Sequence, residues 1–170
     1  MMEPTTSDQP PDSLDPSDAA ELHDLLPFTI GDQTFAVFTD QIDATAEARP
    51  LARLPRAPAA VVGVVCVRGH MLTVLDVGAI LKGSETQWTP ILPFVLVLRG
   101  DEQLGLVAES CRDTITISAE DIEALNLVDY TDAPAALGTV TYGGERMIII
   151  DAPQLFRHAV QRRERRRRRF

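Results

Sequence analysis

Apolar and polar positions alternate along several short stretches of the chain, and this alternation predicts β-strands. Leu26, Phe28 and Ile30 recur at every second position, and a second alternating run follows over residues 33–38. Gly31-Asp32 lies between the two runs, where glycine accepts a positive φ without steric cost. The pattern therefore predicts a β-hairpin near the start of the folded body.

A second pair of strands is predicted over residues 61–67 and 71–75, with Arg68-Gly69-His70 as the connection. Asp76 follows directly, and its carboxylate can cap a short helix that ends at Gly83. Valine, isoleucine, leucine and threonine dominate this central part of the chain, which favours a β-rich body over a helical one.

Two segments outside these strands are predicted from their capping residue and their prolines. Ser17 can cap a short helix that places Leu22, Leu25 and Leu26 on one side. Residues 49–58 contain three prolines, which favour an extended surface loop.

The strand pattern occurs twice. Residues 63–81 align without a gap on residues 138–156, and glycine and aspartate fall in the same register. The hairpin over residues 31–38 likewise resembles residues 100–107. The chain is thus two copies of one unit, and about five strands per copy suit a small closed barrel. Chance similarity between β-rich segments is the alternative explanation.

Charge is distributed unevenly along the 170 residues, so the formal net charge of -9 describes neither end. Residues 1–24 contain only acidic charges and are expected to be a disordered tail. Residues 157–170 hold eight arginines after a helix that Asp151 and Pro153 can open. This Arg-rich end either docks on an anionic partner or is a solvated helix end.

Two cysteines form no disulfide framework, and the acidic N-terminal stretch does not resemble a secretory leader. The apolar runs are too short to span a bilayer, so we expect a soluble cytoplasmic protein. No metal-ligand spacing, phosphate loop or nucleophile elbow is present, so we expect no metal, no cofactor and no enzyme activity. Without interleaved aromatic residues, nucleic acid binding would depend on the Arg-rich end alone.

Arg68 is the most informative polar residue. It lies where an apolar strand turns over, and the equivalent residue of the second copy is Gly143, so the repeat does not require an arginine. It is either an ordinary exposed turn arginine or an anchor whose planar guanidinium pairs with a partner's carboxylates.

These segments resemble the signature of the CheW family. The resemblance is carried by Leu54-Pro55-Arg56-Ala57-Pro58, Val62-Gly63-Val64 and the run from Arg68 to Asp76, and it extends over residues 25–156. It implies a mainly β fold, with two SH3-like five-stranded barrels packed together, short helices and a C-terminal helix. Cys66 and Thr73 depart from the family pattern.

The resemblance also implies a function. A CheW-like chain is expected to be a non-catalytic adaptor that couples the cytoplasmic tips of chemoreceptors to the regulatory domain of a CheA-type histidine kinase, at membrane-associated clusters. It implies Arg68 and Gly63 as protein-binding residues. We expect Val65, Val67 and Ile42 to be protein-binding residues as well. The alternative is an accessory scaffold for pilus or surface sensing, anchored through its Arg-rich end to a membrane, an acidic protein or nucleic acid.

Overall fold

The computed structural model describes residues 19–83, 86–125, 135–155 and 157, and most of them lie in β-strands. A short helical segment over residues 152–155 follows the last strand. The other elements, in chain order, are β1 (Leu22–Ile30), β2 (Gln33–Phe38), η2 (Thr39–Gln41), β3 (Ile42–Pro50), β4 (Val61–Val67), β5 (His70–Leu75), α1 (Val77–Lys82), β6 (Ile91–Leu98), β7 (Leu104–Ala108), β8 (Ser110–Cys111), β9 (Ile115–Ser118), η3 (Ala119–Asp121), β10 (Ala136–Tyr142) and β11 (Glu145–Ile150).

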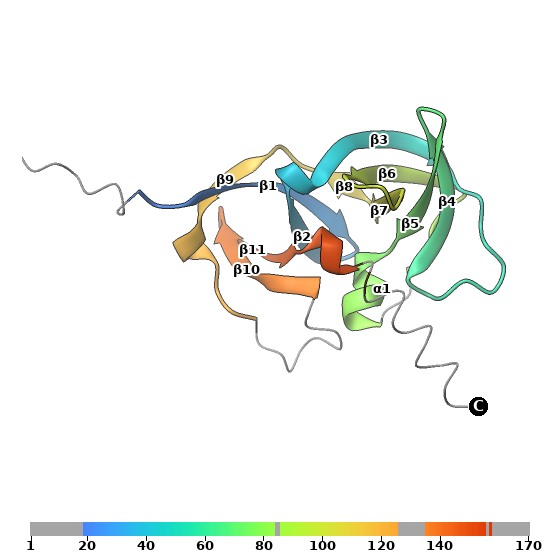
Figure 1. Ribbon diagram of the computed structural model, residues 1–170. Helices are drawn as coiled ribbons and strands as arrows, with labels where there is room; N and C mark the ends of the chain where they lie inside the picture. The colour runs from blue at the N-terminus through green and yellow to red at the C-terminus, as the bar shows by residue number, and fades with distance from the viewer. Residues whose placement is uncertain (1–18, 84–85, 126–134, 156, 158–170) are drawn as a thin grey trace, which may run out of the picture.

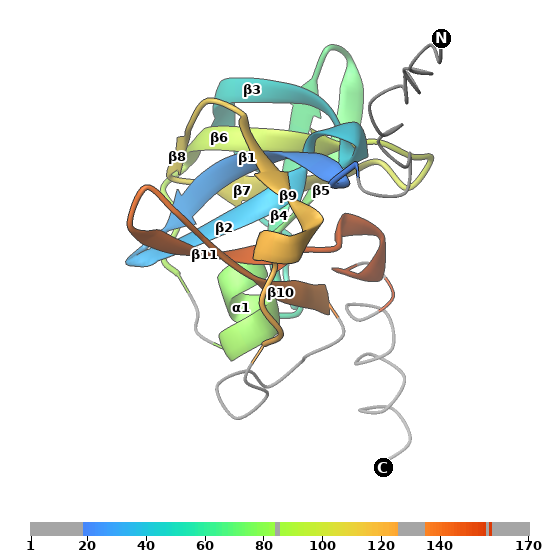
Figure 2. The ribbon, with the colours of Figure 1, turned by 90° about the vertical axis from the view of Figure 1, so that its left-hand side faces the viewer.

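The strands form two curled sheets that lie side by side (Figure 1). The first, barrel A, has the order β10-β11-β2-β1, and both β8 and β9 pair with β1. The second, barrel B, has the order β3-β6-β7-β5-β4. Helix α1 lies beside β10 at the lower side of the molecule in both views (Figures 1 and 2). The predicted mainly β fold of two packed barrels is confirmed.

Each barrel combines strands from both copies of the repeat. In barrel A the first copy supplies β1 and β2, and the second copy supplies the remaining strands. In barrel B the second copy supplies β6 and β7, which lie between β3 and β5. Two parallel ladders join the copies, with Phe35 of β2 opposite Ile148 of β11 and Leu75 of β5 opposite Leu106 of β7. A barrel is therefore a hairpin of one copy completed by strands of the other.

Each barrel closes at an equivalent β-bridge. Ala52, just after β3, exchanges two backbone hydrogen bonds with Val64 of β4, at 2.9 and 2.8 Å. Glu123 and Thr139 of β10 make the matching pair, with both hydrogen bonds at 2.8 Å. The bridge satisfies backbone groups that an open sheet edge would leave exposed.

A glycine next to each bridge permits this close approach. A Cβ at Gly63 would lie 2.4 Å from the carbonyl oxygen of Ala52, and one at Gly138 would lie 2.7 Å from that of Glu123. Both distances are shorter than any tolerated contact, so only glycine fits. The Gly63–Gly138 match in the repeat is therefore explained by barrel closure.

The strands at the centre of barrel A bury both of their faces. Phe35 of β2 and Ile148 of β11 belong to a large core that continues into barrel B. Their neighbours Ala36 and Ile149 belong to a smaller core inside barrel A. An uninterrupted apolar run such as residues 148–150 is expected in a strand that is covered on two sides. The shared core holds the two barrels together.

The predicted helix from Ser17 to Leu26 is wrong over its described part, because residues 22–26 belong to β1. Leu22 pairs with Ser118 and Leu25 with Ile115 of β9. Hydrogen bonds to this distant strand therefore satisfy backbone N–H and C=O groups that would otherwise bond within a helix. The ordered body thus begins at least three residues before the predicted boundary at residue 25.

The predicted loop over residues 49–58 begins later than expected, because β3 continues to Pro50. Residues 1–18 and 158–170, which hold most of the two predicted tails, lie outside the described residues. So does the end of the predicted C-terminal helix, of which residues 152–155 and 157 are helical.

Asp76 and Asp151, both predicted to cap helices, have different roles. One oxygen of Asp76 accepts a 3.1 Å hydrogen bond from a backbone N–H of α1, and the other accepts a 2.9 Å bond from Trp88 Nε1. Asp151 instead receives a 3.4 Å bond from Gln41 Nε2, and Gln41 Oε1 accepts from the N–H of Ala152 at 3.0 Å. A glutamine from η2 thus performs the capping that was predicted for Asp151.

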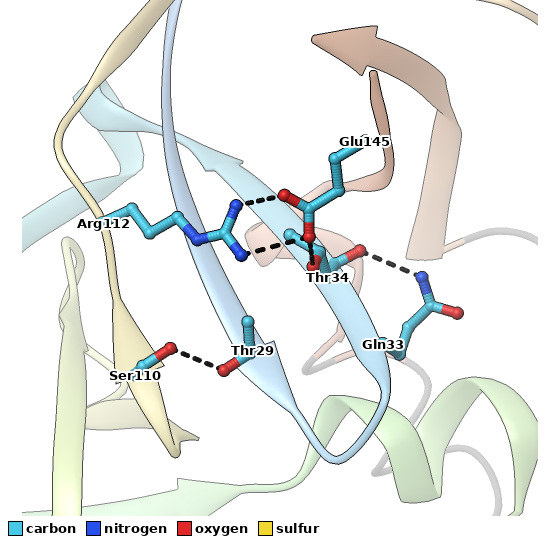
Figure 3. A network of polar contacts seen from close by, with 6 residues as sticks. All are labelled: Thr29, Gln33, Thr34, Ser110, Arg112 and Glu145. Carbon is cyan, nitrogen blue, oxygen red and sulfur yellow. Dashed lines mark hydrogen bonds and ion pairs between the residues drawn. The ribbon is translucent and has the colours of Figure 1, made fainter. Parts of the chain in front are cut away.

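A polar network crosses the outside of barrel A (Figure 3). Arg112 forms a bidentate ion pair with Glu145, which also accepts a 2.5 Å hydrogen bond from Thr34 Oγ1. These residues come from the segment after β8, from β11 and from β2, so the network ties three parts of the barrel together. The Arg112 guanidinium lowers the pKa of the Glu145 carboxyl from its ordinary value, with a further contribution from Thr34.

We expect Gly63→Ala to lower the free energy of unfolding by about 2–4 kcal/mol, because the methyl group collides with the Ala52 carbonyl and breaks barrel closure. Gly144→Ala is the matched control: its φ is +80°, but nothing lies within 4 Å, so the loss should be about 1–2 kcal/mol. Urea denaturation measures both changes. A loss at Gly63 no larger than that at Gly144 would contradict the closure argument.

The Arg112–Glu145 pair predicts a pH-dependent difference in stability. Because the folded pKa of Glu145 lies below its ordinary value of 4.5, the pair stabilises the protein above pH 4.5 and loses this effect as the pH falls through the folded pKa. At pH 7 the free energy of unfolding should therefore be higher for the wild type than for Glu145→Gln. The difference should be small, because the pair is exposed, and it should decrease in acid. Glu120→Gln, which removes an exposed carboxylate outside this network, is the control; a gap independent of pH would exclude the ion pair as its source.

Candidate functional site

The β4–β5 turn presents Arg68 at the end of barrel B. Val67 pairs with His70, so Arg68 and Gly69 form a two-residue turn, with φ values of +49° and +82°. Positive φ at both positions is the type I′ geometry, which favours Asn-Gly or Gly-Gly over an arginine. The equivalent β10–β11 turn contains Gly143 and Gly144, with φ values of +58° and +80°. Arg68 is therefore in a backbone conformation that the other copy gives to glycine.

The Arg68 side chain is exposed and makes no hydrogen bond or ion pair with any described residue. Its five N–H donors are thus available to a partner, and they are arranged in the fork that matches a carboxylate. A left-handed non-glycine residue costs stability, so an arginine with no internal contact here is an observation that points to function.

Three of the other predicted protein-binding residues lie inside the barrel. Val65 and Val67 are 1% and 7% exposed and belong to the large core, and Gly63 is buried at the bridge. Their side chains offer no surface to a partner, so as direct contacts these predictions are corrected. Their place in the core does position the β4–β5 hairpin that carries Arg68.

The outward face of the hairpin is formed by residues that sequence reasoning missed. Val64 is half-buried, Cys66 is exposed, and Met71, directly opposite Cys66, is 54% exposed. A two-residue turn at Arg68-Gly69 fixes the pairing of Cys66 with Met71, so the turn type alone could have identified this face. We call Val64, Cys66, Arg68 and Met71 the hairpin surface.

Ile42, the last of the predicted residues, lies on a different strand pair. It opens β3, pairs with Leu98 of β6 and is half-buried against the large core. The structure therefore does not bring Ile42 into the β4–β5 hairpin.

The described part of the chain holds no candidate metal site. Three or more His, Cys, Asp or Glu side chains are nowhere grouped there in a way that could hold a metal ion. Burial, together with the charge of Glu47, raises the pKa of the Cys111 thiol to about 11, so this cysteine stays protonated at neutral pH. Burial also raises the pKa of Asp76, whose oxygens accept from Trp88 and α1. No helix among the described residues is long and apolar enough to cross a membrane.

Comparison with known proteins agrees with this architecture. The family model of the CheW-like domain matches residues 24–160, most of the chain. The chain belongs to the CheW-like family. A solved structure with the same fold is the scaffolding protein TtCheW from Thermoanaerobacter tengcongensis, which matches with a TM-score of 0.67 at 17% identity and covers 80% of this chain and 88% of its own.

Curated relatives of this CheW-like chain include the chemotaxis protein CheW of Rhizobium meliloti, 27% identical over 78% of this chain and 86% of the relative. The protein FrzA of Myxococcus xanthus is 27% identical over 89% of this chain and 96% of the relative. The predicted family membership is thus confirmed.

We expect Arg68→Gly to raise the free energy of unfolding by about 0.5–1 kcal/mol, because glycine removes the left-handed strain and no internal contact is lost. The reciprocal change Gly143→Arg should lower it by a similar amount. Urea denaturation of both variants tests the pair. Destabilisation by Arg68→Gly would show that Arg68 has a structural role.

Proposed function

We propose that this CheW-like chain is a non-catalytic adaptor that couples chemoreceptors to a CheA-type histidine kinase. The observation that carries the proposal is the exposed, left-handed Arg68 at the tip of a hairpin, in a chain that matches the CheW-like domain from residue 24 to residue 160. The curated relatives named for chemotaxis support the same biological setting.

The hairpin surface has the composition of a small protein interface. Val64 and Met71 supply apolar area, which contributes roughly 25 cal/mol per Å² when it is removed from water. Arg68 supplies directional hydrogen bonds next to that area, a combination that is common at interface hot spots. A surface of this size binds weakly on its own, so useful strength requires several copies acting together, as in an array.

The partners that we propose are the regulatory domain of the kinase and the cytoplasmic tip of a receptor, with the adaptor in the cytoplasm at membrane-associated receptor clusters. Because the two barrels share one core, the chain forms a rigid link: a partner on barrel B and a partner on barrel A would be held at a fixed separation. A rigid link with two ends is what an adaptor between a receptor and a kinase requires.

Arg68→Glu should reduce the binding of a purified receptor tip or kinase regulatory domain at least tenfold, because the repulsive charge replaces a carboxylate-binding group. Arg99→Glu is the matched control, since Arg99 is also exposed and the charge change is the same. Surface plasmon resonance at one fixed salt concentration compares the variants. Equal affinities for both partners in the two variants would remove Arg68 from the interface.

The eight arginines of residues 157–170 favour the second candidate function, a scaffold anchored to an anionic partner. A chain that ends at residue 160 distinguishes the two functions in the same experiment. If the truncated chain retains its affinity for receptor and kinase, the barrels carry the coupling. If affinity disappears, and about 0.5 M salt abolishes binding of the full chain, the Arg-rich end carries it.

A further inference from the structure

A cavity of about 300 Å³ lies beside the start of β4, away from the turn that carries Arg68. The cavity is lined by the loop over residues 53–59 and by residues 86–88 of the connector between the two copies of the repeat. Trp88, the single tryptophan of the chain, lines this cavity. The cavity thus lies at the point where the first copy meets the connector.

Two arginines line the cavity, and both are exposed. Arg53 Nη2 donates to the backbone oxygen of Trp88, which fixes the guanidinium against the connector and leaves its other donors available. Arg56 has a left-handed φ of +61° and makes no hydrogen bond or ion pair with any described residue. Although the net charge of the chain is -9, the opening of the cavity carries the positive charges of these two arginines.

The one acidic residue among the described residues of the lining does not neutralise these arginines. Asp76 is 1% exposed, and its oxygens accept from Trp88 Nε1 at 2.9 Å and from the N–H of Ala79 at 3.1 Å. It forms no ion pair with Arg53 or Arg56. The buried carboxylate therefore shapes the floor through Trp88, and the cationic groups at the mouth face solvent.

We propose that this cavity binds a carboxylate side chain from an acidic segment of a partner protein. The Arg56 guanidinium, assisted by the free donors of Arg53, pairs with the carboxylate, and such charge-assisted bidentate bonds are among the strongest hydrogen bonds in proteins. Apolar lining from Leu54, Pro58 and Val62 accommodates the methylene groups of the segment.

The size of the cavity favours a peptide side chain over a larger ligand. Cofactor and drug-sized sites extend from about 300 to 1,000 Å³, so this cavity lies at the lower limit and holds one or two side chains. The site is separate from the hairpin surface, so it gives the adaptor a second contact that does not depend on Arg68.

The test uses the intrinsic fluorescence of Trp88 in the full chain. The probe is an acetylated six-residue peptide of alternating Glu and Ala, and the reference is the same peptide with Gln in place of Glu. The Glu peptide should give a saturable change in emission and the Gln peptide none. Arg56→Gln should weaken binding about tenfold or more, and Arg99→Gln, an equal loss of charge at another exposed arginine, should not.

All three proteins keep the C-terminal arginines, so peptide binding to residues 157–170 contributes equally to each. Circular dichroism confirms that Arg56→Gln is folded, and its exposed, unengaged side chain makes that the expected result. The proposal is overturned if the Gln peptide binds as well as the Glu peptide, if Arg56→Gln and Arg99→Gln behave alike, or if emission does not change at millimolar peptide. An equal response to inorganic phosphate would show a general anion site and would also overturn it.

Discussion

The parallel pairing of β2 with β11 and of β5 with β7 is the constraint on which the rest of the structure depends. Each ladder joins a hairpin of one copy of the repeat to strands of the other, so neither barrel exists without both copies. The pairing also places β2 and β11 between two apolar layers, which creates the continuous core beneath both barrels. Closure at Gly63 and Gly138 then completes each sheet without a free edge at the bridge.

A rigid core of this kind leaves function to the turns and loops, where backbone geometry is less constrained by packing. Comparison of the two copies supports this difference between core and turns. The β10–β11 turn has two glycines where the β4–β5 turn has Arg68 and Gly69. The loop over residues 53–59 shows the same feature, with Arg56 in a left-handed conformation that glycine would adopt more easily. In both places an exposed arginine departs from what local folding alone favours.

Much of the fold could be predicted from the sequence, because its signals are local. The hairpin at Gly31-Asp32, the helix between Asp76 and Gly83 and the gapless repeat all follow from side-chain periodicity and turn chemistry. The way in which each barrel combines a hairpin of one copy with strands of the other could not be predicted, since pairing between distant strands leaves no local pattern. The helix predicted around Leu25 failed because this segment pairs on one side with β9, about ninety positions later, and on the other with β2 of its own hairpin. At the site, Arg68 was identified from the broken repeat symmetry. Val65 and Val67 were expected at the binding surface, but their side chains lie in the core. The outward positions of Cys66 and Met71 follow from the turn register, which the sequence analysis did not use.

The exchange of hairpins has a consequence for how the chain folds as it leaves the ribosome. The first half emerges with β3, β4 and β5 of barrel B, but β6 and β7, which lie between β3 and β5, are synthesised later. The β1–β2 hairpin waits still longer, until β10 and β11 appear near the end of translation. The β1–β2 and β4–β5 hairpins of the nascent chain can pair internally, but until the second copy emerges they lack the strands that complete each barrel. Folding therefore depends on contacts of large sequence separation, which form slowly. The interlocked architecture that makes the finished protein rigid is the same one that delays its completion.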